Sequence, residues 1–377
     1  MSSTLLNKVC IVALSLLSLA SQNTVSAQEA AVSTSEPVNK IRVGLMVPPQ
    51  NSTVAAATAP LIKGVEAAFK EDEDRYELIK YEVGESGDVL SVLNQAADTK
   101  AMLMIGPVLK TSVDKIASLP YLPLPVVAIN KTDSAVQPEL FMSIDVAIES
   151  EVEQLVKVAL ENTVQRPGTD FVVFATPNSY DERVARAIVQ ELRKNGAEGE
   201  IRHISTEQIA YIRTEMRGKS FRGGFFAMDP HQASLIRPYL PPELPVFGTR
   251  YTNPYRSNDL MTSQTQANDL TGMVTLEIPA ITQLSHQNYL KYRPILLKLN
   301  SDDRHLFAVG VDAWRLGKSW LEWQDQIDIE DGLSGKIHFD KKVSSRASRT
   351  LDKTVVKPKR DLEDDVAFEE SAEEAGL

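Results

Sequence analysis

Apolar runs of strand length alternate with amphipathic helical segments along the first part of this chain. IRVGLMV (41–47) is a buried-strand pattern, and in the LIKGVEAAF that follows (61–69) the apolar residues share one helical face. The alternation then continues with predicted strands at 78–83, 101–106 and 125–130, and with predicted helices at 89–97 and 111–117. Such a β-α rhythm predicts a parallel sheet with helices on both faces.

The same rhythm restarts after a helical stretch at 149–162. Ser179-Tyr180-Asp181-Glu182 predicts a capping box that opens a helix ending near Gly196. Asp229 is placed to cap a helix whose first residue is Pro230. The strands predicted for this half are 170–175, 200–204, 223–229 and 245–249.

A third part differs from both halves. It has a predicted strand at 272–279, helices at 288–300 and 305–323, and a final strand at 334–339. We therefore predict an α/β fold of two lobes, each a mainly parallel sheet flanked by helices, with crossovers at a hinge. The folded domain is expected over 40–340. The boundaries expected within it are about 40–148 plus part of 270–340 for lobe 1, and about 149–269 plus the remainder for lobe 2.

The N-terminal residues read as a targeting segment. Lys8 precedes the apolar run VCIVALSLLSLA, and Val25-Ser26-Ala27 is an A-x-A-like cleavage site, so residues 1–27 predict a signal peptide cleaved after Ala27. The run is too short for a transmembrane segment, which needs ~20 residues. The only cysteine, Cys10, lies inside this leader and lacks the small apolar residues that precede a lipid-anchor cysteine. We expect export to the periplasm of a Gram-negative bacterium without a lipid anchor.

Two segments of biased composition flank the predicted domain. Residues 28–39 predict a flexible lead-in. Residues 341–360 carry eight Lys or Arg and a single Asp, whereas residues 361–377 carry eight Asp or Glu and neither Lys nor Arg. Charge blocks with few large apolar residues are typical of disorder, so a disordered tail is expected over 341–377. The two blocks could attract each other, or one could bind a partner.

The composition and motifs argue against several function classes. A net charge of -11 disfavours nucleic-acid binding, which needs a basic surface. The sequence has no G-x-S-x-G elbow, no Walker loop and no H-E-x-x-H, and its five histidines lack metal-ligand spacing. We therefore expect no catalytic residues, no metal and no cofactor.

Polar residues instead recur just after predicted strand ends. Ligands of open α/β sheets bind at the carboxyl ends of strands, so these residues outline a candidate cleft for a small molecule, a cell-wall fragment or a partner. They are Gln50, Asn51, Ser52, Lys110, Thr111, Ser112, Asn130, Asn178, Ser179, Thr249, Arg250 and Tyr251. This pattern indicates binding rather than catalysis.

The apolar stretch FAVGVDAWRL (307–316) contains one aspartate, Asp312. On a helical wheel Phe307, Val311 and Trp314 share a face, and Asp312 points to the opposite side. Gly310 and Gly317 lie beside the apolar face and would let another backbone approach. We interpret Asp312 and Trp314 as structural anchors.

Several linked motifs resemble the LppC/LpoA family of penicillin-binding-protein activators. They are IGPVLKTSVDKI (105–116) with LPVVAIN (124–130), LTGMVTLEIPAI (270–281), and FAVGVDAWRL with LSGKIHFD (333–340). The resemblance covers roughly 41–340 and implies a type I periplasmic-binding-protein fold, similar to leucine-binding proteins. It does not include the lipobox cysteine or the long helical-repeat domain that precedes this fold in the best-known members.

The resemblance implies a non-catalytic exported protein that takes part in regulating peptidoglycan biosynthesis. Its implied partner is a class A bifunctional penicillin-binding protein, whose cross-linking it would stimulate. The alternative is a periplasmic solute-binding receptor for an amino acid or other small metabolite, serving an ABC importer or a sensor. Thr111 and Ser112 could then hold a ligand carboxylate.

Overall fold

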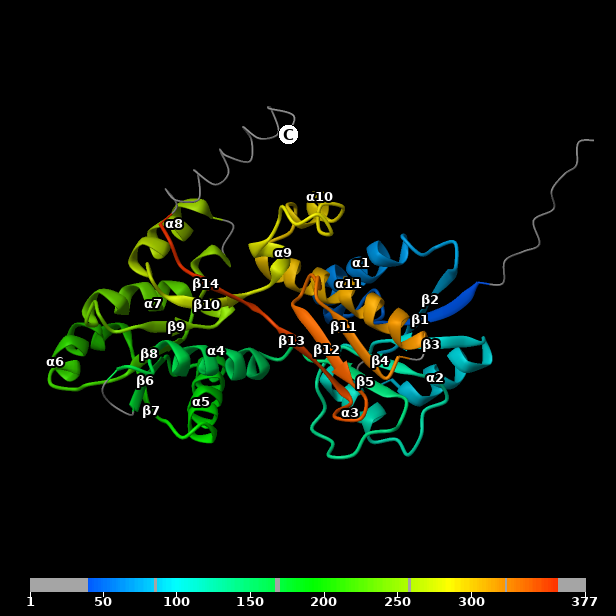
Figure 1. Ribbon diagram of the computed structural model, residues 1–377, viewed down its shortest axis with the longest axis horizontal. Helices are drawn as coiled ribbons and strands as arrows, with labels where there is room; N and C mark the ends of the chain where they lie inside the picture. The colour runs from blue at the N-terminus through cyan, green and yellow to red at the C-terminus, as the bar shows by residue number, and fades with distance from the viewer. Residues whose placement is uncertain (1–39, 85–86, 167–169, 257–258, 323, 359–377) are drawn as a thin grey trace, which may run out of the picture. The chain divides into compact units, whose positions relative to one another are not determined.

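The computed structural model describes residues 40–84, 87–166, 170–256, 259–322 and 324–358, which form two sheets joined by crossing segments (Figure 1). The expected signal peptide (1–27) and lead-in (28–39) lie outside the described residues. Among those residues, none of the helices has the length and apolar character that crossing a membrane requires.

The first lobe is built on an eight-stranded sheet with the order β11-β12-β13-β5-β4-β3-β1-β2. The pairs from β13 through β2 are parallel, whereas β11 and β12 pair antiparallel. Its strands are β1 (Ile41–Val47), β2 (Tyr76–Glu82), β3 (Ala101–Ile105), β4 (Val126–Ala128), β5 (Phe141–Ile144), β11 (Gln326–Ile329), β12 (Lys336–Asp340) and β13 (Arg346–Thr350). Its helices are α1 (Thr53–Phe69), α2 (Val89–Asp98), α3 (Lys110–Ala117), α9 (Pro279–Thr282), α10 (Arg293–Leu296) and α11 (Ser301–Leu321).

The second lobe is built on a six-stranded sheet with the order β14-β10-β9-β8-β6-β7, in which β14 alone is antiparallel. Its strands are β6 (Asp170–Ala175), β7 (Glu198–His203), β8 (Gly223–Ala227), β9 (Val246–Gly248), β10 (Val274–Glu277) and β14 (Asp352–Val355). Its helices are α4 (Ile148–Asn162), α5 (Ser179–Lys194), α6 (Ile212–Met216), α7 (Pro230–Ile236) and α8 (Leu260–Asp269), with 3-10 turns η1 (Thr206–Tyr211), η2 (Arg237–Tyr239), η3 (Arg250–Thr252) and η4 (Pro254–Arg256).

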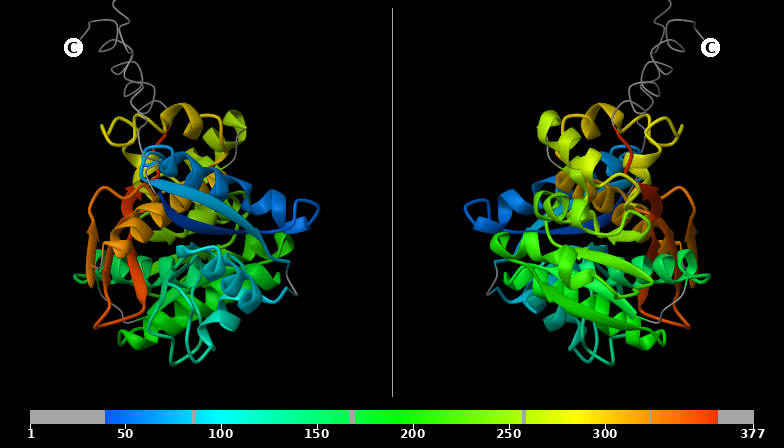
Figure 2. Two further views of the ribbon diagram at one scale, coloured as in Figure 1. Left: turned by 90° about the vertical axis from the view of Figure 1, so that its right-hand side faces the viewer. Right: turned by 90° about the vertical axis from the view of Figure 1, so that its left-hand side faces the viewer.

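Helices cover both faces of each sheet, as the parallel rhythm predicted (Figure 2). Alternate residues of one strand enter different cores: Phe171 and Val173 of β6 pack with α4 and α5, whereas Val172 packs with α6, α7 and α8. In the first lobe, α1 and α11 form one core with the sheet, and α2 and α3 form the other. The predicted α/β class and its two mainly parallel sheets are confirmed.

The helices α1 and α11 pack with their backbones in contact. A Cβ added to Gly310 would lie 2.1 Å from the carbonyl oxygen of Leu61, and one added to Gly64 would lie 2.1 Å from that of Phe307. The close approach expected at Gly310 is therefore present, whereas a Cβ on Gly317 would meet the side chain of Leu103 instead.

The C-terminal part departs most from the sequence prediction. Residues 334–339 do not form the last strand, because β13 and β14 follow, so the expectation of disorder from residue 341 is wrong over 346–355. Backbone pairing places these charged residues in strands: β13 pairs with β5 and β12, and β14 pairs with β10. Leu351, between the two strands, packs against cores of both lobes. Residues 359–377 lie outside the described part.

Smaller corrections have local causes. The strands β5 and β11, with four residues each, were not predicted. The helix expected over 288–300 is reduced to α10, which begins at Arg293 and carries Pro294 in its first turn. A proline is tolerated there, whereas a helix that began at residue 288 would place Pro294 in its interior, where its missing N–H and its ring break the helix. The N-cap of α5 is Asn178 rather than Ser179, because the Asn178 side chain accepts a hydrogen bond from the Asp181 amide.

Candidate functional site

The candidate residues of the first lobe lie at the carboxyl ends of β1, β3 and β4. Ser112, in the first turn of α3, is 1% exposed, and its Oγ has no hydrogen-bond partner among the described residues. It lines a mostly apolar pocket of about 20 Å³ together with Pro48 and Pro107. The Oγ of Ser52 is likewise buried and unpartnered within the described part, while Gln50, Asn51 and Thr111 are exposed. This volume holds about one water molecule, so this pocket does not accommodate an amino acid.

Two candidates of this lobe, Lys110 and Asn130, have internal partners. Lys110 Nζ lies 3.0 Å from Asp114 Oδ2 and 2.8 Å from Asp133 Oδ2. Its hydrogen bond with Asp133 raises the pKa of Lys110 against the opposing effect of burial. Asn130 donates to the Val108 carbonyl at 3.3 Å and accepts from the Lys131 amide at 2.9 Å.

The candidates of the second lobe gather at the carboxyl ends of β6 and β9. Asn178 caps α5 and donates to Thr176 Oγ1 at 2.6 Å, and the exposed Ser179 follows it. Tyr251 packs edge-on against Tyr180 with ring centroids 4.8 Å apart. The Arg256 guanidinium lies 5.1 Å from the Tyr251 ring centroid.

Burial and two carboxylates at the same strand ends raise the pKa of Tyr251. Burial, followed by the charges of Asp181 and Asp229, raises the pKa of Tyr251 to about 12, so this phenol stays protonated at neutral pH. Asp181 and Thr249 are both fully buried, and each has one side-chain oxygen without a partner in the described structure. The lobe thus presents an aromatic pair backed by buried oxygens.

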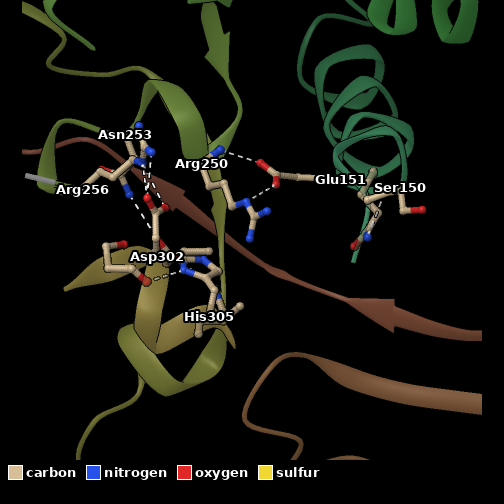
Figure 3. Close-up of polar contacts among 12 residues, drawn as sticks. Ser150, Glu151, Arg250, Asn253, Arg256, Asp302 and His305 are labelled. Atoms are coloured by element: carbon tan, nitrogen blue, oxygen red, sulfur yellow. Dashed lines mark hydrogen bonds and ion pairs between the residues drawn. The ribbon is translucent and has the colours of Figure 1, made fainter. Parts of the chain in front are cut away.

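Buried ion pairs connect these strand ends, and sequence reasoning missed them. Glu151 of α4 is 5% exposed and accepts a hydrogen bond from the Arg250 amide, while Arg250 Nε lies 3.4 Å from its other oxygen (Figure 3). Glu277 is 3% exposed, and its Oε1 lies 2.7 Å from His305 Nε2. Asn253 donates to Glu277 Oε2 at 3.1 Å.

The pKa values of Glu151 and Glu277 are shifted in opposite directions. Burial raises the pKa of Glu151 against the opposing charge of Arg250. Burial also disfavours ionisation of Glu277, but the charge of His305 and its hydrogen bond hold the pKa of Glu277 below its usual value. One signal for Glu151 was available, because it follows Ile148 and precedes Leu155 on the apolar face of α4.

The start of α4 holds cations from both lobes. Glu149 lies 2.7 Å from Arg183 of α5 and 3.6 Å from Lys131, which follows β4. Asp145 lies 3.3 Å from Arg346 of β13. The acidic groups before and within the first turn of α4 therefore pair with cations from three other parts of the chain.

Asp312 and Trp314 have specific contacts in the core. The expectation that Asp312 faces away from the packed side is wrong, because it is fully buried. Its carboxylate accepts hydrogen bonds from the amides of Leu333 and Ser334 at 3.1 and 2.7 Å, and from the Ser334 hydroxyl at 2.7 Å. Trp314 donates from Nε1 to Asp72 at 2.8 Å. Asp312 thus fixes the loop after β11 to α11.

The described residues contain no group of three or more His, Cys, Asp or Glu side chains placed to hold a metal ion. The candidates form two groups, one at each sheet, and their charged members are held by neighbouring side chains. This arrangement suits a preformed binding surface.

Comparisons with known proteins show what this chain is similar to. Residues 30–214 match the family described as "LppC putative lipoprotein". A curated relative, the penicillin-binding protein activator LpoA of Histophilus somni, is 26% identical over 257 residues, which are 65% of this chain and 42% of that protein. The chain thus spans less than half the length of the curated relatives it matches. The resemblance to the LppC/LpoA family is confirmed.

Solved structures agree on the fold. A "putative branched-chain amino acid ABC transporter" from Chromobacterium violaceum is similar with a TM-score of 0.68 at 22% identity, covering 84% of this chain and 100% of that chain. Full-length LpoA from Haemophilus influenzae is similar with a TM-score of 0.66 at 17% identity, covering 85% of this chain and 58% of that chain. The fold is that of the leucine-binding-protein-like, type I periplasmic binding proteins.

Proposed function

We propose, for a chain that matches the LppC family over residues 30–214, that it is a non-catalytic activator of peptidoglycan synthesis. It binds a class A bifunctional penicillin-binding protein and stimulates the cross-linking that this enzyme performs. The observation that carries the proposal is the family match together with relatives named as penicillin-binding protein activators.

The electrostatics of the candidate cleft support a binding role without catalysis. Lys110, Lys131 and Arg250 each lie beside an internal carboxylate. A carboxylate partner favours the charged form of a lysine, and an arginine stays protonated at neutral pH, so these three side chains do not serve as general bases. They hold the carboxyl ends of the strands in one arrangement, which a partner can bind as a preformed surface.

The proposal includes export to the periplasm. Residues 1–27 act as the signal peptide, and cleavage after Ala27 releases a chain that begins at Gln28. Sequencing the N-terminus of the protein recovered from a periplasmic fraction tests this. An intact leader, or a start other than Gln28, would contradict the assigned cleavage.

Binding and stimulation are tested separately. The immobilised chain should retain a class A penicillin-binding protein from detergent-solubilised membranes, and the purified chain should increase cross-linked product in a synthesis assay with a lipid-linked precursor. The same chain after heat denaturation is the control. Failure of both assays at micromolar concentration would refute the proposal.

A role as a solute receptor has less support. A ligand at 100 times its Kd would stabilise the chain by ~2.7 kcal/mol, a readily visible shift in melting temperature. We expect no such shift with a panel of amino acids, because the Ser112 pocket holds about 20 Å³ and the neighbouring Lys110 is already paired.

A further inference from the structure

The segment between β10 and α11 exposes apolar side chains beside lysines. Leu290, Ile295 and Leu297 are 44%, 38% and 55% exposed, which is unusual for large aliphatic residues in one short stretch. Lys291 and Lys298 are exposed among them. We call these five residues the α10 patch.

The α10 patch is positive in an acidic protein. From residue 283 to residue 300 the sequence contains three Lys or Arg and no Asp or Glu, whereas the whole chain carries a net charge of -11. Lys291 pairs with Glu71 of the acidic turn after α1. Lys298 has no ion pair among the described residues. A ligand for this surface therefore needs negative charge and apolar side chains.

The described chain ends close to this segment. The carbonyl of Lys357, just after β14, accepts a hydrogen bond from the Tyr255 hydroxyl. Arg256, which follows Tyr255, donates hydrogen bonds to the carboxylate of Asp302 in the first turn of α11, with donor–acceptor distances of 2.7 to 3.1 Å. The α10 segment leads directly into this turn, so two contacts connect the end of the described chain to the base of the patch.

The sequence beyond this point has the required chemistry. Residues 361–377 contain eight Asp or Glu and no Lys or Arg, and the acidic residues are interspersed with Leu362, Val366 and Phe368. An extended chain spans ~3.3 Å per residue, so a segment of this length can span up to ~60 Å from Pro358. Tethering also raises the effective concentration of the segment to the millimolar range expected for short linkers.

We propose that residues 361–377 of this chain bind the α10 patch, with their carboxylates on Lys291 and Lys298 and their apolar side chains on Leu290 and Leu297. The bound segment covers aliphatic surface that otherwise faces water. Any partner that binds the α10 patch must displace the acidic segment first. The inference does not depend on the proposed function.

Zero-length cross-linking of the full chain tests the proposal. A carbodiimide joins carboxylates to amines that are in contact, and mass spectrometry then identifies the lysines joined to Glu369, Glu370, Glu373 and Glu374. We expect several-fold more of these products at Lys291 and Lys298 than at the exposed Lys63 and Lys115. The excess should fall at about 1 M salt, where the screening length is ~3 Å.

Substitutions in the α10 patch distinguish specific binding there from nonspecific electrostatic attraction between the acidic segment and exposed lysines. Leu290→Ser combined with Leu297→Ser should reduce the cross-links to Lys298 several-fold, and Lys298→Glu should reduce those to Lys291. The matched control is Tyr121→Ser, which alters a side chain that is 72% exposed in the loop after α3. Circular dichroism verifies that each variant is folded. An even distribution over the exposed lysines, an absence of tail cross-links, or equal effects of patch and control substitutions would overturn the inference.

Discussion

Replacing Asp312 tests whether a buried carboxylate fixes the loop after β11 to α11. In Asp312→Ala, the amides of Leu333 and Ser334 lose their acceptors, and each buried unsatisfied donor costs about 1–3 kcal/mol. We therefore expect a loss of about 2–6 kcal/mol in the free energy of unfolding. In Asp312→Asn one oxygen remains and one amide loses its acceptor, so the expected loss is about 1–3 kcal/mol.

The pH dependence gives a second, independent signature. Burial raises the pKa of Asp312, against the hydrogen bonds from Ser334 and the charge of Arg315. Between the unfolded pKa of ~3.9 and the higher folded pKa, the folded chain binds more protons than the unfolded chain, so the stability contributed by this group falls as pH rises. Asp312→Asn lacks this dependence, so its deficit relative to wild type should be largest in acid and should shrink toward neutral pH.

Urea denaturation followed by tryptophan fluorescence, repeated between acid and neutral pH, measures both effects. The control Asp74→Ala alters an exposed aspartate and should change stability by no more than ~0.5 kcal/mol. The reasoning is refuted if Asp312→Ala is as stable as this control, or if the Asn deficit grows with pH.

Three further substitutions test the packing and the buried charges. Gly310→Ala would place a Cβ 2.1 Å from the Leu61 carbonyl oxygen, so we expect a loss of at least about 1–3 kcal/mol in thermal denaturation. In Gly84→Ala the nearest atom is 4.0 Å away, and a similar loss there would contradict the packing argument. Because the pKa of Glu277 is lowered, its charge contributes stability above the unfolded pKa of ~4.3 that is lost as pH falls through the folded value. Glu277→Gln should thus be less stable than wild type at neutral pH, with the gap closing in acid; a gap that widens in acid would be inconsistent with this assignment. Trp314→Phe removes the hydrogen bond to Asp72 and should cost about 1.5–3 kcal/mol in urea titrations, more than Trp320→Phe, whose ring contacts Phe339 edge-on.

The sequence predicted elements well where periodicity and capping agree. The strand β1 coincides with the predicted 41–47, and Asp229 caps α7 before Pro230 as expected. The Asp229 cap is a local interaction. The strand β1 does pair with the distant β2 and β3, but its apolar run already marks a buried strand in the sequence.

The sequence prediction failed where contacts between residues distant in sequence determine the secondary structure. The strand β13 reads RASRT, and nothing in these polar residues signals a strand until β5 and β12 supply backbone partners. Arg349 in this strand is half-buried, its desolvation lowers its pKa to about 10, and it donates to the Asp145 and Ser334 carbonyls. Composition cannot distinguish such a residue from a solvated one.

The sequence predicted where the candidate site residues lie, but it did not predict which of them are already paired with neighbouring side chains. Strand ends did gather Thr249, Arg250 and Tyr251 near Tyr180 and Glu151. The partner of each charge depends on which elements pack together, and one sequence does not contain that information. Glu149 illustrates this, since its two cations come from opposite lobes.

The crossing from β13 to β14 has a consequence for biogenesis. Each sheet obtains one strand from residues 346–355, and Leu351 between them enters cores of both lobes. Neither lobe can therefore acquire its full complement of strands while that part of the chain is still being synthesised or translocated. Final closure of the two halves is thus coupled to a single late event, and a proteolytic cut just before residue 346 would remove strands from both lobes at once.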